Sequence, residues 1–174
     1  MGTADAGQAQ VGVKVALGEG AVVSSGLTVL DHLLGELARA ARIELAVEAA
    51  PGAVDQAVAG AGRGVGEGIA PLLRARGATG HGYAWLPAAE ALAGAVIEIS
   101  DRPLVASNVD FSGVGGLRSD VVAVFLEELA AGAGLNVHIR VLEGKDPQNV
   151  LSAIFKALGA AIGQACRTPE GGAP

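Results

Sequence analysis

The chain has 174 residues and a formal net charge of −6; apolar residues make up 51% of it and aromatic residues only 3%. This composition lacks the basic field and the stacking aromatic side chains of nucleic-acid-binding proteins. The longest run without Asp, Glu, Lys or Arg, residues 77–89, is too short to cross a membrane and contains a proline. With one cysteine and no visible secretory signal, we expect a cytoplasmic protein without disulfides.

The first half of the chain predicts three strands and two helices. Apolar residues alternate over 11–17 and again over 43–47, which is strand spacing, and residues 21–29 form a further strand or its approach. Residues 31–42 place leucines on one helical face, with Thr28 or Asp31 as the cap. Residues 53–76 predict an Ala/Gly-rich helix. Because an interior glycine costs about 0.5–1 kcal/mol relative to alanine, that helix needs close packing against a neighbouring helix or sheet.

The second half predicts a similar order. Strands are expected at 95–100, 105–111 and 135–141, and helices at 119–131 and 148–167. The change from helical to strand spacing recurs at a constant offset of 92 residues, which favours an internal repeat. We expect one α+β domain over residues 1–174. Its internally duplicated β-β-α-β-α halves, about 8–82 and 83–167, would pack helices on one face of each four-stranded sheet and be sandwiched together, with tails at 1–8 and 168–174.

Few residues suggest chemistry by themselves. The glycine-rich stretch 62–68 follows a helical segment rather than a strand, which argues against a phosphate-binding loop. The three histidines are far apart in sequence, so they form no local metal pair. His138 should lie on the face of its strand opposite the core, and His81 in an exposed loop. Cys166 is expected to be a buried apolar residue.

Five segments occur in a fixed order along the chain. They are SGLTVLDHLL (25–34), PAAEAL (87–92), EISDRP (98–103), LNVHI (135–139) followed by Gly144-Lys145, and SAIFKA (152–157). This ordered set resembles the imidazoleglycerol-phosphate dehydratase family, over about residues 8–167. The resemblance implies a duplicated β-β-α-β-α fold and, for an active member, a carbon–oxygen lyase of histidine biosynthesis.

The resemblance also implies two manganese ions, held between neighbouring chains by two H-H-x-x-E motifs and one helix histidine from each half. Here the motif positions are Asp55, Gln56 and Ala59 in the first half and Gln148, Asn149 and Ser152 in the second, and the helix histidines correspond to His32 and Val124. Gln, Asn, Ser and Ala hold a transition-metal dication weakly or not at all. We therefore expect no metal cofactor, and a pocket lined by Asp55, Gln56, Gln148, Asn149 and Ser152.

Other matched positions suggest ligand contacts. Arg102 and Lys156 match family positions that help to hold phosphate, and Lys145 lies in the matched turn, so all three are candidate ligand-binding residues. Glu90 and His32 are the candidate catalytic groups, although both could equally be solvated or capping residues. The family's N-terminal R-x-T-x-E-T segment falls on Asp5–Ala9, and its R-[YF]-G turn on 80–82; neither keeps the arginine.

Three functions are compatible with these observations. The first is a degenerate family member with a structural or interaction role, or one that binds a small phosphorylated or imidazole-like ligand around Glu90, Arg102 and Lys156. The second is a repurposed metal-independent enzyme that uses Glu90, Asp55, His32 or His138 as acid–base groups. The third is an active dehydratase with other metal ligands. From the resemblance we expect a homo-oligomer, with the trimer retained and the family's 24-subunit shell weakened.

Overall fold

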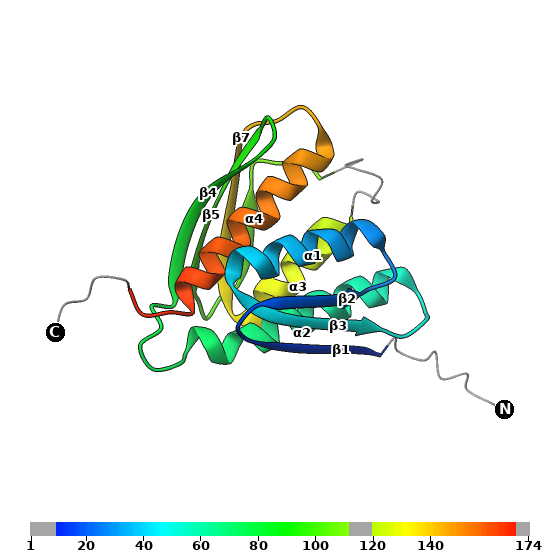
Figure 1. Ribbon diagram of the computed structural model, residues 1–174, viewed down its shortest axis with the longest axis horizontal. Helices are drawn as coiled ribbons and strands as arrows, with labels where there is room; N and C mark the ends of the chain where they lie inside the picture. The colour runs from blue at the N-terminus through cyan, green and yellow to red at the C-terminus, as the bar shows by residue number, and fades with distance from the viewer. Residues whose placement is uncertain (1–9, 112–119, 170–174) are drawn as a thin grey trace.

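The computed structural model describes residues 10–111 and 120–169. Its elements, in chain order (Figure 1), are β1 (Val11–Leu17), β2 (Gly20–Ser24), α1 (Thr28–Ala41), β3 (Ile43–Ala49), α2 (Val54–Leu73), β4 (His81–Ala88), β5 (Ala91–Ile99), β6 (Leu104–Ser107), α3 (Val121–Ala133), β7 (Leu135–Glu143) and α4 (Pro147–Ala165). The predicted tail at 1–8, the predicted helix start at Ser119 and the end of the tail at 170–174 lie outside the described residues. In the described part, no helix is long and apolar enough to cross a membrane.

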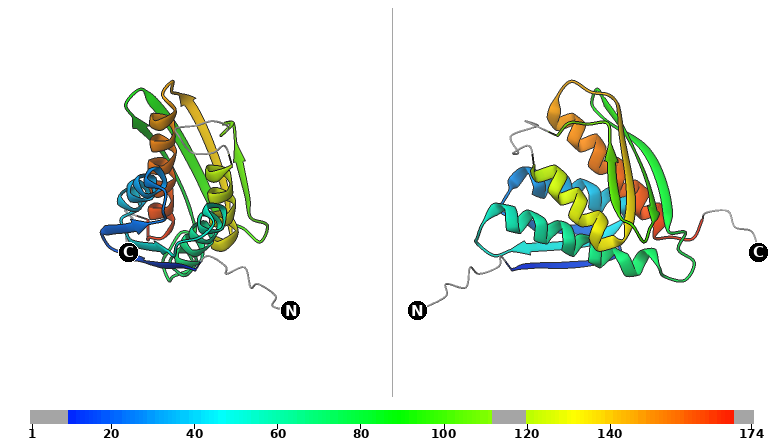
Figure 2. Two further views of the ribbon diagram at one scale, coloured as in Figure 1. Left: turned by 90° about the vertical axis from the view of Figure 1, so that its right-hand side faces the viewer. Right: turned by 180° about the vertical axis from the view of Figure 1, so that it is seen from behind.

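The four helices of the described residues lie between their two sheets (Figures 1 and 2). One sheet has the order β1-β3-β2 and packs against α1 and α2, whereas the other has the order β4-β5-β7-β6 and packs mainly against α4. In both sheets the strand before the helix, β2 or β6, is parallel to the strand after it, β3 or β7. The α+β sandwich is confirmed, but the expectation of two four-stranded sheets is wrong for the described residues, because the first sheet has three strands.

Strand β4 was missed by the sequence analysis. It forms an antiparallel hairpin with β5, so His81 begins an edge strand rather than lying in a loop, and the predicted boundary at 82/83 falls within β4. The period-2 signal was weak because the first two inward residues, Gly82 and Ala84, are small. The large residues Tyr83 and Trp85 point outward and are 64% and 48% exposed.

The start of α1 also differs from the prediction. Its N-cap is Leu27, and neither Thr28 nor Asp31 caps it. Asp31 lies in the first turn, and its carboxylate accepts a hydrogen bond of 2.8 Å from the backbone N–H of Ser25. The carboxylate thus fixes the chain that enters the helix instead of closing the helix end.

Close packing explains the glycines of α2 and α4. A Cβ at Gly62 or Gly66 would meet the backbone of α3, and one at Gly159 or Gly163 would meet the backbone of α1. A second glycine row on α2, formed by 60, 64 and 68, meets the valine side chains of β1. The predicted close approach of this helix to both a helix and a sheet is therefore confirmed. Buried Leu, Ile, Val and Ala form the rest of the core that the structure describes, together with a buried aromatic pair, Phe125 and Phe155.

Two predictions about single residues are confirmed. His138 is exposed on the outer face of the second sheet, between Val96 and Ala106 of the neighbouring strands. Cys166 is only 4% exposed, and its burial raises the pKa of the thiol to about 11.

Candidate functional site

The N-terminal end of α4 carries most of the site residues predicted for the second half. Asp146 caps this helix by accepting a hydrogen bond of 2.8 Å from the backbone N–H of Gln148, and Pro147 occupies the first helical position. Asn149, Ser152 and Lys156 follow at spacings of three and four residues, which places them on one side of the helix. The sequence therefore positions these side chains together through a single helix start.

Glu90, in the turn between β4 and β5, holds this helix start in place. Its Oε1 accepts hydrogen bonds from the backbone N–H groups of Lys145 (3.1 Å) and Asp146 (2.8 Å). Its Oε2 accepts a bond of 2.7 Å from the side-chain amide of Asn149. One carboxylate thus ties the β4–β5 turn to the turn that precedes α4.

These bonds determine the chemistry available to Glu90. The backbone N–H of Asp146 is the largest influence, followed by the other hydrogen bonds, and together they lower the pKa of the carboxyl from 4.5 to about 2. A general base works best when its pKa lies near the working pH. The contacts of Glu90 are therefore those of a structural acceptor, and its predicted catalytic role stays a prediction that this geometry does not favour.

A second cluster joins α1 to α4. Ser152 donates a short hydrogen bond to Glu36 Oε2, and His32 Nε2 lies 3.7 Å from Glu36 Oε1. The imidazole of His32 is largely exposed, at 70%, whereas Glu36 is 15% exposed. Sequence reasoning missed Glu36, although its spacing of four residues from His32 on a predicted helix was the available signal.

The remaining candidates do not form one site within a chain. Lys156 Nζ donates a bond of 2.7 Å to the carbonyl of Pro87, near the Glu90 turn. Arg102 instead follows the far end of β5, whose nine residues span about 26 Å. The predicted ligand region around Glu90, Arg102 and Lys156 is therefore divided between opposite ends of this strand.

The predicted first-half positions lie on a different helix pair. Asp55 and Gln56 are in the first turn of α2, which packs against α3 and β1, whereas α4 packs against α1, β4 and β5. An ion pair of 3.1 Å between Arg63 Nε and Glu128 Oε2 joins α2 to α3. The two sets of predicted pocket residues are thus held apart within one chain.

The donor chemistry of the described residues does not fit a pair of transition-metal dications. Among them, no group of three or more His, Cys, Asp or Glu side chains is placed to hold a metal ion. All three histidines of the chain are described, and they lie on α1, β4 and β7. A neighbouring copy would bring only the same three imidazoles, and amide or hydroxyl groups are weak ligands for such ions.

Comparison with known proteins gives a consistent family. A family model described as imidazoleglycerol-phosphate dehydratase matches residues 25–162. The chain is 34% identical over 154 residues to the imidazoleglycerol-phosphate dehydratase of Clostridium botulinum (strain Kyoto / Type A2), covering 85% of this chain and 79% of the relative. It is 32% identical over 160 residues to that of Halorhodospira halophila, covering 88% and 81%.

The fold is also similar to solved structures. The crystal structure of imidazoleglycerol-phosphate dehydratase from Staphylococcus aureus superposes with a TM-score of 0.83 at 24% identity, over 92% of this chain and 95% of that one. The enzyme from Pyrococcus furiosus in complex with (S)-C348 gives 0.82 at 24% identity, over 94% and 92%. At this level of identity the structural matches support the fold alone.

Proposed function

The chain belongs to the imidazoleglycerol-phosphate dehydratase family, and from this premise we propose that it is a member that has lost the manganese-dependent dehydration. In this proposal the retained fold serves a structural or interaction role or binds a small ligand, phosphorylated or imidazole-like. The proposal covers the activity only, since membership of the family does not depend on it.

One observation carries the proposal. At the motif positions of α4, an amide and a hydroxyl replace the ligands that the resemblance implies, and both are engaged by the chain's own carboxylates. Asn149 is bound to Glu90, and Ser152 to Glu36. A carboxylate that already accepts hydrogen bonds is a poor candidate to rearrange around a cation, because those bonds must be broken first.

A second candidate is an active dehydratase. The named relatives are 32–34% identical to this chain over about four fifths or more of its length, and on the comparisons alone this candidate is the better supported. It requires metal donors other than those of the matched motifs. The third candidate, a repurposed metal-independent enzyme, has less support, because His32, Asp55 and His138 lie on three separate elements and Glu90 in the β4–β5 turn, with no contact recorded between any two of them.

The proposed assembly is a homo-oligomer, with a trimer retained and a 24-subunit shell weakened because the chain lacks ligands that would join trimers through metal ions. Light scattering in the presence of a chelator tests this. A trimer mass supports the proposal, and a 24-subunit mass contradicts it.

Metal content and turnover test the loss of dehydration. The protein is purified from manganese-supplemented cultures, its metal is measured by mass spectrometry, and dehydration of imidazoleglycerol phosphate is assayed with added Mn²⁺. The Clostridium botulinum relative, treated identically, is the positive control. We expect manganese far below one ion per chain and no turnover above the blank. Stoichiometric manganese together with turnover would establish the second candidate instead.

A further inference from the structure

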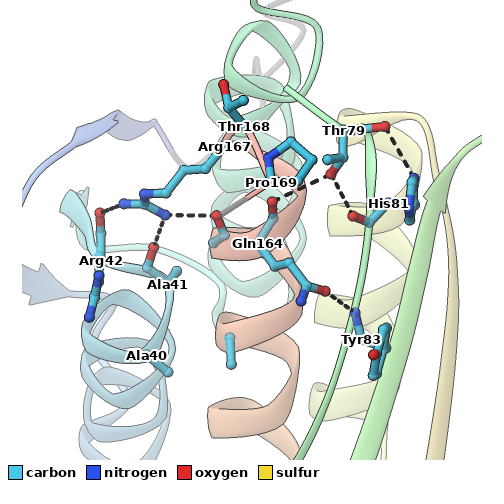
Figure 3. Close-up of a pocket in the computed structure, with 12 residues that line it drawn as sticks. Ala40, Ala41, Arg42, Thr79, His81, Tyr83, Gln164, Arg167, Thr168 and Pro169 are labelled. Carbon is cyan, nitrogen blue, oxygen red and sulfur yellow. Dashed lines mark hydrogen bonds between the residues drawn. The ribbon is translucent and has the colours of Figure 1, made fainter. Parts of the chain in front are cut away.

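A cavity of about 550 Å³ lies at the opposite end of α4 from the cluster described above (Figure 3). It opens where α1 and α4 end and where β4 begins. Arg42, His81, Tyr83, Gln164 and Arg167 are among the residues that line it. None of the lining residues that the structure describes is acidic, although the chain as a whole has a net charge of −6. The cavity is thus a locally cationic place on an acidic protein.

Arg167 lies between the helix ends that border this cavity and keeps hydrogen-bond donors for a ligand. Its Nη1 donates hydrogen bonds of 2.8 Å to the carbonyls of Ala41 and Gly163, and its Nη2 donates one of 2.6 Å to the carbonyl of Arg42 (Figure 3). These carbonyls belong to the negative C-terminal ends of α1 and α4, so the guanidinium offsets their dipoles. A guanidinium has five N–H donors, and two of these five remain after the three bonds.

Arg42 has a backbone conformation that is unfavourable for a residue with a side chain. It caps α1 in the left-handed conformation, with φ of 54°, which side chains other than glycine rarely adopt. Its guanidinium forms no hydrogen bond or ion pair with any other described residue, so the strain is not repaid by an internal contact of the side chain. Strain retained without an internal contact is grounds for assigning the side chain a role toward a ligand.

The other helix pair of the same chain offers a comparison. A second cavity, of about 480 Å³, lies at the ends of α2 and α3 and is lined by Glu67, Ala70, Pro71, Arg74 and residues 131–134. Arg74 corresponds to Arg167 there: its Nη1 donates hydrogen bonds to the carbonyls of Ala70 (3.2 Å) and Ala133 (3.0 Å). The cap of α3 is Gly134, with φ of 70°, where α1 has Arg42.

The two cavities also differ at two other corresponding positions. Glu67 and Pro71 of the second cavity lie 93 positions before Ala160 and Gln164 of the first. Both cavities have an arginine that donates hydrogen bonds to the helix ends. Among the described lining residues, only the first cavity has a cation at the helix cap (Arg42) and a side-chain amide (Gln164), and only the second is lined by a carboxylate (Glu67).

Gln164 adds a neutral donor. Its Oε1 accepts a bond of 2.7 Å from the backbone N–H of Tyr83, which fixes the amide at the free edge of β4 (Figure 3). The NH₂ group of the amide has no partner among the described residues. From this set of donors we propose that the cavity binds a small molecule through a carboxylate or phosphate group, with Arg42, Arg167 and Gln164 as its contacts.

This site is separate from the loss of dehydration proposed above. It uses neither the motif positions of α4 nor a metal ion, and its test includes no dehydratase assay. Failure of one proposal therefore leaves the other unchanged.

Thermal shift and calorimetric titration test the site, with inorganic phosphate and acetate as probes at constant ionic strength. Two variants of the whole chain remove the proposed contact in different ways. Arg42→Gly removes the cation and relieves the strained cap, so it should be at least as stable as the wild type. Gln164→Glu keeps the acceptor for Tyr83 but places a negative charge in the cavity. Arg39→Ala removes one positive charge from α1 outside the cavity and is the matched control.

We expect at least one probe to bind the wild type and Arg39→Ala equally, and the affinity to fall about tenfold or more in both cavity variants. The stronger probe identifies the anion as phosphate-like or carboxylate-like. Sodium chloride, titrated in the same way, is the control for non-specific anion binding. The proposal is overturned if neither probe binds the wild type more tightly than chloride does, or if Arg42→Gly and Gln164→Glu bind as the wild type does.

Discussion

Replacing Gly159 with alanine tests how closely α4 packs against α1. A Cβ at this position would lie 2.3 Å from the carbonyl oxygen of Leu37 and 2.9 Å from its Cα. Ordinary contacts between carbon and a carbonyl oxygen begin at about 3.3 Å, so the two helices would have to separate by about 1 Å. Both helices are rigid there, because Leu37 and Leu158 are fully buried.

The size of the effect follows from two opposing terms. Overpacking costs about 1–3 kcal/mol, and we expect a cost of about 3 kcal/mol here because the atoms in the way are backbone atoms of Leu37. Alanine, in turn, favours the helix by about 1 kcal/mol relative to glycine. We expect a net loss of about 2 kcal/mol, which lowers the Tm of a chain of this size by about 4–8 °C.

Gly35→Ala is the matched control, because a Cβ at this position of α1 meets nothing within 4 Å. This variant should gain about 0.5–1 kcal/mol and melt slightly above the wild type. Calorimetry and urea titration at one chain concentration measure both, since assembly makes Tm depend on concentration. If Gly159→Ala is as stable as Gly35→Ala, the close helix contact is wrong.

Three further predictions concern single side chains. The Glu90 carboxylate, with its pKa lowered from 4.5 to about 2, stabilises the fold above pH 4.5 and loses that contribution as the pH falls toward 2. Urea stability should therefore fall less steeply between pH 5 and 3 in Glu90→Gln than in the wild type; equal slopes would contradict this. Arg74→Met should lose about 1 kcal/mol in urea titration, because it removes hydrogen bonds to two helix carbonyls, of which the one to Ala133 is partly buried; Arg76→Met, which removes no such bond, should lose little. Cys166, buried and with a pKa of about 11, should react with Ellman's reagent at pH 8 only after denaturation, and rapid reaction of the native protein would refute its burial.

The helices could be predicted because their inward faces carry large residues at helical spacing. Leu30, Leu33, Leu34 and Leu37 of α1 are all buried, and the strict alternation of β3 and β7 was equally informative. The first part of strand β4 follows the opposite rule, with Gly82 and Ala84 inward and Tyr83 and Trp85 outward, so hydrophobic alternation alone was not expected to reveal it.

The candidate site was predictable only where one helix carries it. The spacing of Gln148, Asn149 and Ser152 requires them to share the start of α4, and they do. Their partners Glu36 and Glu90 come from α1 and a distant turn, and nothing local in the sequence indicates such contacts. Arg102 was grouped with Glu90 because the sequence order did not reveal that the two residues lie at opposite ends of β5.

Pairs of residues about 92 positions apart make corresponding contacts in the two helix pairs. Arg74 and Arg167 each bond to the end of their own helix and of the neighbouring one. The carboxylates at 36 and 128 each reach across to the partner helix, Glu36 to Ser152 and Glu128 to Arg63. These contacts support the proposed internal repeat.

The same comparison bears on function. In both helix pairs a cross-helix link is made by the chain's own side chains, a hydrogen bond in one and an ion pair in the other, so neither link requires a cation. The C-terminal ends differ more, since Arg42 and Gln164 have Gly134 and Pro71 as counterparts. The Arg42 guanidinium and the NH₂ group of Gln164 are present at only one of these ends and donate to no other described residue, so they are the donors that a ligand would meet.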